Sequence, residues 1–204
     1  MQKVKSTLTH RQRQALATRQ VIVDAACELF LTQGYIATTI EAISAKAGVA
    51  VSTVYAVFRN KRGILQAIRE NWHQESGQRD IYRQAMEQTD PKRRLELTAY
   101  ATRRQWETSG AMIAIYQAAA AADPDAAAEL ATALQGRRTF LTHFINSMTE
   151  QLRSGLSPAR AITLLYTLTL PTIYQDLVKG EGWSPEEYEA WLAQTLQQQL
   201  LPSR

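Results

Sequence analysis

The stretch Thr38–Lys61 constrains the fold of this chain more than any other. Its sequence, TTIEAISAKAGVAVSTVYAVFRNK, has the pattern of two short helices joined by a tight turn. We expect Thr38 to cap the first helix and Glu41 to complete a Thr-x-x-Glu capping box, and Gly48 stands where a helix end favours a left-handed residue. The second helix has apolar positions at Val51, Val54, Val57 and Phe58, and outward positions at Ser52, Thr53, Tyr55 and Ala56. Because these outward side chains are short or carry hydroxyls, the pattern predicts a helix-turn-helix whose second helix enters a DNA major groove.

Positive charge is concentrated at the N-terminal end. Residues 1–61 hold eight Lys and Arg against three Asp and Glu, a net charge of +5, whereas residues 62–204 have a net charge of −1. A basic surface beside a helix-turn-helix indicates contact with phosphates, although a solvated basic tail without a partner is the alternative. Residues 1–13 are polar and basic without periodicity, so they are expected to form an arm along DNA or a disordered terminus.

Composition narrows the remaining classes. With 45% hydrophobic residues the chain can bury a substantial core. No apolar run approaches the ~20 residues of a membrane span and no secretory signal is visible, so no membrane partner is expected. The single cysteine, Cys27, fits a reducing cytoplasm and is expected to be a small buried hydrophobe rather than a reactive thiol.

Prolines punctuate the rest of the chain. A capping residue precedes proline at Asp90-Pro91, Asp123-Pro124, Ser157-Pro158 and Ser184-Pro185, and each pair predicts a helix start. Glu187 adds a second capping box to Ser184, while Pro171 is expected to kink its helix. The predicted C-terminal helices run near Pro91–Thr108, Gly110–Ala122, Asp125–Arg153, Pro158–Lys179 and Pro185–Gln199.

These signals predict an all-α protein with two domains. Residues 1–61 would form the DNA-binding domain, with a first helix near Gln14–Gln33, and residues 62–204 an effector-binding and dimerisation domain. A three-helix unit of this size is marginal alone, so we expect support from a fourth helix that begins near Arg62. The three-helix core is predicted to contain Ile22, Ala26, Leu29, Phe30, Ile40, Ile43, Val54 and Phe58.

The order of residues from Arg19 to Lys61 resembles the N-terminal domain of the TetR family of transcriptional regulators. The residues that carry the resemblance are Ile22, Ala25, Ala26, Leu29, Phe30, Gly34, Thr38, Thr39, Ile43, Ala47, Gly48, Val49, Thr53, Tyr55, Phe58 and Lys61, with Leu65 just after. The remainder of the chain matches the family only in the number and length of its helices.

The resemblance implies a role for particular residues. Thr38 or Thr39 would contact phosphate, Thr53 and Tyr55 would contact the DNA backbone, and Lys61 would bind phosphate. Base contacts would come from the start of the recognition helix, at Ala50, Val51 and Ser52. Ala50 departs from the Ser that is usual in the family, which weakens the helix cap unless Ser52 shifts the helix start. The apolar Ala50-Val51 pair favours contact with thymine methyl groups.

Two C-terminal stripes predict a homodimer. The residues that fall on these stripes are Ile162, Leu165, Thr169, Tyr188, Trp191, Leu192, Thr195 and Leu196. Two amphipathic helices at a chain end can form a four-helix bundle with a second copy, or can simply close the monomer core. The family resemblance favours the dimer, which would bind a near-palindromic double-stranded operator.

Aromatic side chains in the middle helices suggest a small-molecule pocket, although an ordinary aromatic core is the alternative. The candidate effector contacts are Tyr100, Arg103, Trp106, Tyr116, His143, Phe144, Tyr166 and Tyr174. Arg103 or Arg104 would otherwise pair with Glu107. The resemblance implies that an effector binds in this region without naming it.

An enzyme is not expected, since the chain has no phosphate-binding Gly-rich loop, no metal-spaced ligand set and no nucleophile elbow, and no cofactor is expected. The sequence therefore favours a dimeric repressor released from DNA by a small molecule. A regulator without an effector, an activator, or a helical protein-interaction module are the alternatives.

Overall fold

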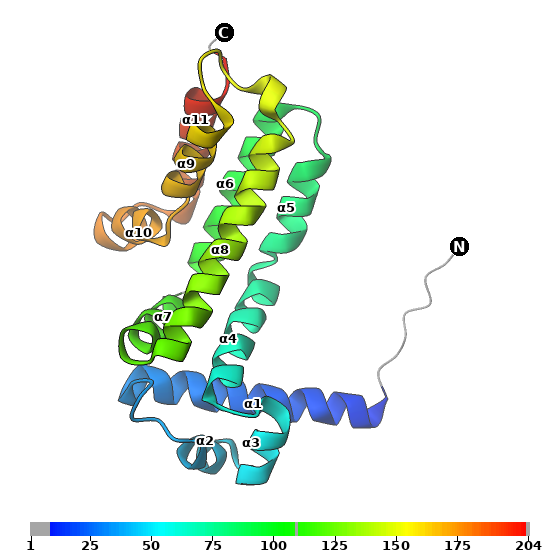
Figure 1. The fold of residues 1–204 in the computed structure, drawn as a ribbon, viewed down its shortest axis with the longest axis vertical. Helices are drawn as coiled ribbons and strands as arrows, with labels where there is room; N and C mark the ends of the chain where they lie inside the picture. Colours follow the sequence, from blue (N-terminus) through cyan, green and yellow to red (C-terminus); the bar gives the residue numbers. More distant parts are fainter. Residues whose placement is uncertain (1–8, 109, 203–204) are drawn as a thin grey trace. The chain divides into compact units, whose positions relative to one another are not determined.

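Every regular element in the described part of the chain is helical. The computed structural model describes residues 9–108 and 110–202 (Figure 1). Its elements are α1 His10–Gln33, α2 Ile40–Ala47, α3 Val51–Phe58, α4 Lys61–Ser76, α5 Gln78–Glu87, α6 Pro91–Glu107, α7 Gly110–Ala122, α8 Pro124–Asn146, the 3-10 helix η1 Thr149–Gln151, α9 Pro158–Leu168, α10 Pro171–Tyr174, the π-helix η2 Gln175–Gly180 and α11 Pro185–Leu200. No strand occurs in the ranges described, and the predicted all-α class is confirmed.

The chain divides into two compact units that differ from a simple cut at residue 61. The first unit holds the residues up to 69 together with 111–129, and the second holds 70–110 and 130–204. Polar contacts join these segments within the first unit: the buried Tyr116 hydroxyl on α7 donates to the Leu65 carbonyl at 2.9 Å, and Glu129 on α8 pairs with Arg69 on α4 at 3.0 Å. Helices α4 and α8 each run without interruption from one unit into the other.

In the first unit, α1 packs against α2, and α2 packs against α3 (Figure 1). All eight predicted core residues of these helices are buried, because apolar positions three and four apart form one stripe on each helix. Ile64, Leu65 and Ile68 on α4 are also buried. They extend this apolar core, as predicted for the supporting helix.

In the second unit, α6 packs against both α5 and α11, and α9 also packs against α11. The Trp72 and Trp106 rings stack with centroids 5.8 Å apart. The Trp72 Nε1–H donates to the Gln105 carbonyl at 3.0 Å. Aromatic side chains thus form much of this core.

The four predicted proline-associated helix starts are confirmed. Asp90, Asp123 and Ser157 each accept a hydrogen bond from a backbone N–H in the first turn of the following helix. Ser184 and Glu187 form the complete capping box that opens α11. Proline fits each first turn because its missing N–H would have no helical partner there.

Three predicted boundaries were wrong. Helix α1 begins at His10 rather than near Gln14, because Thr9 and Gln12 form a capping box; the remainder of the predicted arm, residues 1–8, lies outside the described residues. The predicted helix Asp125–Arg153 ends at Asn146. Pro171 ends a helix instead of kinking one: α9 stops at Leu168, and α10 starts at Pro171.

Candidate functional site

The second helix of the helix-turn-helix is α3. Val54 and Phe58 are buried, whereas Tyr55 and Val57 are 47% and 39% exposed. The prediction that Val57 belongs to the buried stripe was wrong, because positions 54 and 58, one turn apart, set the side of this short helix that faces the core. The outer side therefore presents Ser52, Tyr55, Ala56 and Val57.

The start of α3 has no side-chain cap. Ala50 is the N-cap residue, and helix α3 begins at Val51, so Ser52 does not shift the helix start. Ala50 and Ser52 are exposed and Val51 is half-buried. The three residues proposed for base contacts thus lie together in the first turn, with small side chains and accessible backbone.

The N-cap of α2 lies one residue later than predicted. Thr39, not Thr38, is the N-cap of α2, and its hydroxyl accepts from the Ala42 N–H at 3.1 Å. The predicted Thr38–Glu41 capping box was therefore wrong, and Ala42, three residues after Thr39, cannot complete a box. Thr38 is 1% exposed and donates to the Gly34 carbonyl at 2.8 Å, which leaves Thr39 as the threonine accessible to a phosphate.

Lys61 is held by backbone carbonyls inside the domain. Its ammonium donates to the carbonyls of Tyr35 at 2.6 Å and Thr38 at 3.1 Å and lies 4.4 Å from the centre of the Tyr35 ring. Burial lowers the pKa of Lys61. The residue proposed as a phosphate ligand thus ties α4 to the loop before α2.

The other basic side chains of the first unit differ in whether they are paired with a carboxylate. Arg11 and Arg13 are exposed on the first turns of α1, and Arg59 is exposed directly after α3 with φ 64°. Lys46 pairs with Glu28 at 2.6 Å. Among the described residues of this unit, exposed arginines without an ion pair therefore lie at the start of α1 and directly after α3.

Comparison with known proteins identifies the family of this helix-turn-helix. Residues 22–68 match the model of the bacterial regulatory proteins of the tetR family. Residues 22–68 belong to the TetR family.

Curated relatives match about a quarter of the chain. An uncharacterised HTH-type transcriptional regulator of Bacillus subtilis strain 168, YvkB, is 41% identical over 51 residues, 25% of this chain and 27% of YvkB. The HTH-type transcriptional regulator SrpR of Pseudomonas putida is 46% identical over 55 residues, 27% of this chain and 26% of SrpR. The chain thus aligns with about a quarter of the length of each of these relatives.

Solved structures extend the similarity in fold over most of the chain. A SmeT–triclosan complex has a TM-score of 0.73 at 23% identity and covers 91% of this chain and 92% of that one. NalD of Pseudomonas aeruginosa, the secondary repressor of the MexAB-OprM multidrug efflux pump, has a TM-score of 0.67 at 23% identity and covers 93% and 98%. At 23% identity, the similarity to these structures shows a shared fold only.

The candidate effector contacts do not gather around one space. Tyr116 lies in the first unit with the TetR-family domain, whereas the other seven lie in the second. Trp106, Phe144 and Tyr174 are buried, and His143 is exposed. Tyr174 packs edge-on against Tyr188 with ring centroids 4.9 Å apart. Several of these aromatic residues thus fill the core, the alternative left open by the sequence.

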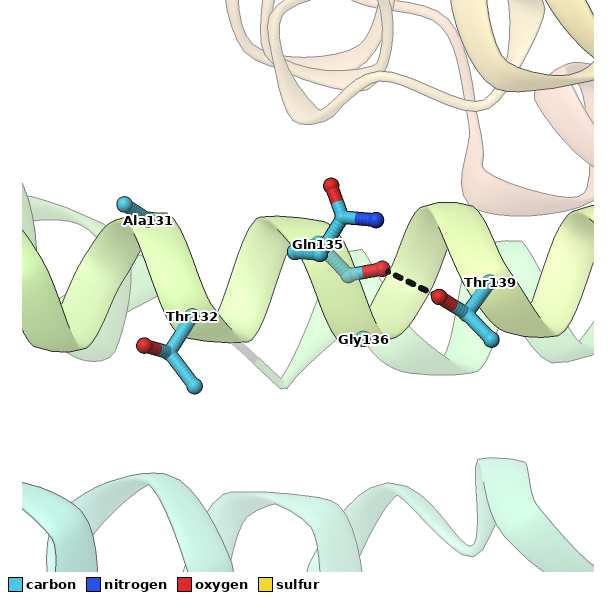
Figure 2. Close-up of a pocket in the computed structure, with 5 residues that line it drawn as sticks. All are labelled: Ala131, Thr132, Gln135, Gly136 and Thr139. Carbon is cyan, nitrogen blue, oxygen red and sulfur yellow. Dashed lines mark hydrogen bonds between the residues drawn. The ribbon is translucent and has the colours of Figure 1, made fainter.

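A hollow of about 680 Å³ lies instead along one side of α8, lined by Ala131, Thr132, Gln135, Gly136 and Thr139 (Figure 2). All five residues are exposed, and none was predicted to contact an effector. Four of the five lining residues are Ala, Thr or Gly, whose short side chains leave space along the helix. Open and without a charged group, this hollow offers a surface but no anchor for a ligand.

Arg103 is the centre of an ion-pair cluster. Its guanidinium lies 2.6 Å from Glu189 and 2.9 Å from Glu107, and the pair with Glu107 was the alternative to ligand contact. Burial alone would lower the pKa of Arg103, but the hydrogen bond to Glu189 and the neighbouring carboxylates raise it. Its charge is balanced within the protein.

Arg137 was missed by the sequence reasoning. Its Nη2 donates to the Thr169 carbonyl and to the Thr169 hydroxyl, the latter at 2.7 Å, and its guanidinium lies 4.9 Å from the centre of the Tyr166 ring. Trp106 Nε1 donates to the same carbonyl at 3.1 Å. The Thr169 carbonyl is free to accept these bonds because α9 ends before Pro171. An Arg-Arg pair three residues before Phe140 was the only signal in the sequence.

The predicted dimer stripes lie mostly inside the protomer. Leu165, Thr169, Tyr188, Leu192 and Leu196 are each 0% exposed. Ile162, Trp191 and Thr195 are only half-buried. A dimer formed through α9 and α11 would therefore use these three positions and their neighbours, while the other five stabilise each protomer.

Among residues 9–108 and 110–202 no three His, Cys, Asp or Glu side chains gather to hold a metal ion. In the same ranges no single helix is long and apolar enough to cross a membrane, although the bent pair α2 and α3 passes that test by length and composition when taken together.

Proposed function

We propose that this chain is a DNA-binding transcriptional regulator, a homodimeric repressor that a small-molecule effector releases from a near-palindromic operator. The observation that carries the proposal is α3, whose small and hydroxyl-bearing outer side is exposed within a TetR-family domain. The start of such a helix can approach base edges in a major groove because Ala50 and Ser52 are exposed and carry short side chains. No enzymatic activity is part of the proposal, and DNA binding places the action in the cytoplasm.

The DNA contacts follow from exposure. Ala50, Val51 and Ser52 at the start of α3 would reach base edges, while Thr53, Tyr55 and Thr39 would contact the DNA backbone. Arg11 and Arg59 add exposed charge that would release counterions from DNA. Lys61 would act chiefly by holding the loop before α2 in place, since its ammonium is committed to carbonyls.

The effector part of the proposal draws on structural neighbours and on helix continuity. SmeT was solved with triclosan and FadR of Bacillus subtilis with stearoyl-CoA. In this chain, α4 and α8 each continue from the first unit into the second. A ligand that binds the second unit more tightly in one arrangement of α4 would shift the position of α3 and weaken DNA binding.

Selection of duplexes from a random DNA library by the full chain tests the proposal. We expect enrichment of a near-palindrome whose half-sites are about 34 Å apart, one turn of DNA. Binding should fall as salt rises, because phosphate contacts release counterions. Failure to enrich any sequence, or binding that is insensitive to salt, would refute the proposal.

A further inference from the structure

Arg94, Arg103 and Arg137 each carry a covered guanidinium in the second unit, but their surroundings differ. Arg103 is balanced by carboxylates. Arg94 is 4% exposed, donates to the Ser147 hydroxyl and lies 4.9 Å from the Phe144 ring centre, so its side chain is sealed in the core. Arg137 is half-buried and remains reachable from outside.

Arg137 has no counter-charge. Among the described residues no Asp or Glu oxygen lies within 4 Å of its guanidinium, and its hydrogen bonds, all from Nη2, go to Thr169. Nε and Nη1 keep their protons free for another acceptor. A covered cation without an anionic partner is costly, and burial accordingly lowers the pKa of Arg137.

A second unsatisfied group lies within electrostatic reach of Arg137. Tyr188 is 0% exposed, and within the described part of the chain its hydroxyl is buried without a hydrogen-bond partner. Burial raises the pKa of Tyr188, and the charge of Arg137 opposes that rise. A buried hydroxyl of this kind is normally paired, so the Tyr188 hydroxyl is a second polar group in this unit that can form a hydrogen bond with a ligand.

Aromatic rings frame the same arginine. The guanidinium lies 5.5 Å from the Trp106 ring centre and 4.9 Å from the Tyr166 ring centre. Phe140, half-buried, follows one turn later on α8. These rings would pack against the apolar body of a ligand while the guanidinium binds its charged end.

We propose that Arg137 anchors a binding site for a small apolar carboxylate, with Tyr166 and Phe140 against the ligand's body and the Tyr188 hydroxyl as a second donor. This inference rests on the proposed function and gives the chemical class of its effector. Arg suits the role because its guanidinium stays charged when covered and forms strong, directional bonds with carboxylates.

Matched acids and amides test the charge requirement on the unmodified full chain. Benzoate, 1-naphthoate and octanoate are each compared with the corresponding primary amide at constant ionic strength, by thermal shift and titration calorimetry. We expect at least one acid to raise the melting temperature and to bind about tenfold or more tightly than its amide. Equal binding of acid and amide, or no binding by any of the three acids, would overturn the proposal.

Variants test the position. Arg137→Gln should abolish the preference for the acid, Arg137→Lys should keep part of it, and Tyr188→Phe should weaken acid binding. Arg160→Gln is the matched control, because Arg160 is exposed on α9, and it should bind the acid as the wild type does. If acid binding survives Arg137→Gln, the carboxylate binds at another site and the proposal is wrong. Helix content measured by circular dichroism shows that each variant is folded.

The same experiment separates this site from the proposed function. The binding measurements need no DNA, and release from the selected duplex is read independently by fluorescence anisotropy. A chain that binds acids through Arg137 but binds no duplex would refute the regulator and leave the carboxylate site standing. A chain that binds its duplex but shows no preference for acids would refute only the carboxylate site.

Discussion

Gly63 shows how a single residue positions the DNA-binding helix. A Cβ atom at this position would lie 2.1 Å from the Phe58 carbonyl oxygen, at the end of α3. The Gly63 N–H also donates to the Asn60 side chain at 2.9 Å. The close approach of α4 to the end of α3 thus depends on the absence of a side chain.

We predict that Gly63→Ala destabilises the fold by about 1–3 kcal/mol, because backbone must move to admit the methyl group. Gly136→Ala is the matched control: nothing lies within 4 Å of its added Cβ, so this change should stabilise the protein by roughly 0.5–1 kcal/mol. Urea denaturation measures both. Equal effects of the two substitutions would contradict the proposed packing.

Lys61 gives a second prediction at this scale. Lys61→Met keeps the stem but leaves carbonyls without their charged donor, so the free energy of unfolding should fall by about 1–3 kcal/mol. Lys46→Met, which breaks an ion pair at the surface, should cost at most ~1 kcal/mol. Unchanged stability of Lys61→Met would contradict this structural role and would leave phosphate binding as the expected role of Lys61.

At the scale of elements, helix starts were predictable where the local sequence offers a single capping residue. Aspartate or serine before proline identified four helix starts, because the first side chain caps the helix and the missing N–H of proline has no partner to lose in the first turn. The start of α2 was harder, since Thr38 and Thr39 have equal capping ability and only burial of Thr38 decides between them. The environments of Lys61 and Arg137 were not predictable, because their partners lie 23 to 32 residues away along the chain.

The uncapped start of α3 predicts a stabilising substitution. Ala50→Ser would supply a hydroxyl for the free N–H groups of the first turn and should raise the free energy of unfolding by about 1 kcal/mol. Ala56→Ser, in the exposed part of the same helix, is the control and should not stabilise. Chemical denaturation distinguishes the two, and equal gains would mean that capping is not the cause.

The cap of α11 predicts a dependence on pH. The hydrogen bond from the Ser184 N–H lowers the pKa of Glu187, so its carboxylate stabilises the folded state above the usual range for a glutamate and loses this effect as pH falls through it. Thermal melts between pH 6 and 3 should therefore show a smaller loss of stability for Glu187→Gln than for the wild type. Identical pH dependence would contradict the cap's contribution.

For the whole molecule, the order of the helices was predictable, whereas the residues that make up each of the two units were not. Tyr116, 51 residues from Leu65, groups with the N-terminal helices through one buried hydrogen bond that no local pattern reveals. Trp106, Phe144 and Tyr174, three of the aromatic residues expected around an effector, are buried, because composition does not distinguish a ring that lines a cavity from one that packs in the core.

Operator choice is a property of the assembled protein on DNA. The apolar Ala50-Val51 pair at the start of α3 predicts contact with thymine methyl groups. Replacing thymine by uracil throughout the selected duplex should therefore weaken binding, and restoring the methyl group at single positions should locate the contacts. Unchanged affinity for the uracil duplex would exclude methyl readout.

The most direct test of the central claim is the affinity of the full chain for its selected duplex, measured by fluorescence anisotropy in wild type and Tyr55→Ala. Tyr55 is 47% exposed on α3, so its loss should leave the melting temperature nearly unchanged and weaken DNA binding about tenfold or more. Leu134→Ala, 44% exposed on α8, is the control and should bind as the wild type does. Wild-type affinity in the Tyr55 variant would contradict DNA recognition through this face of α3.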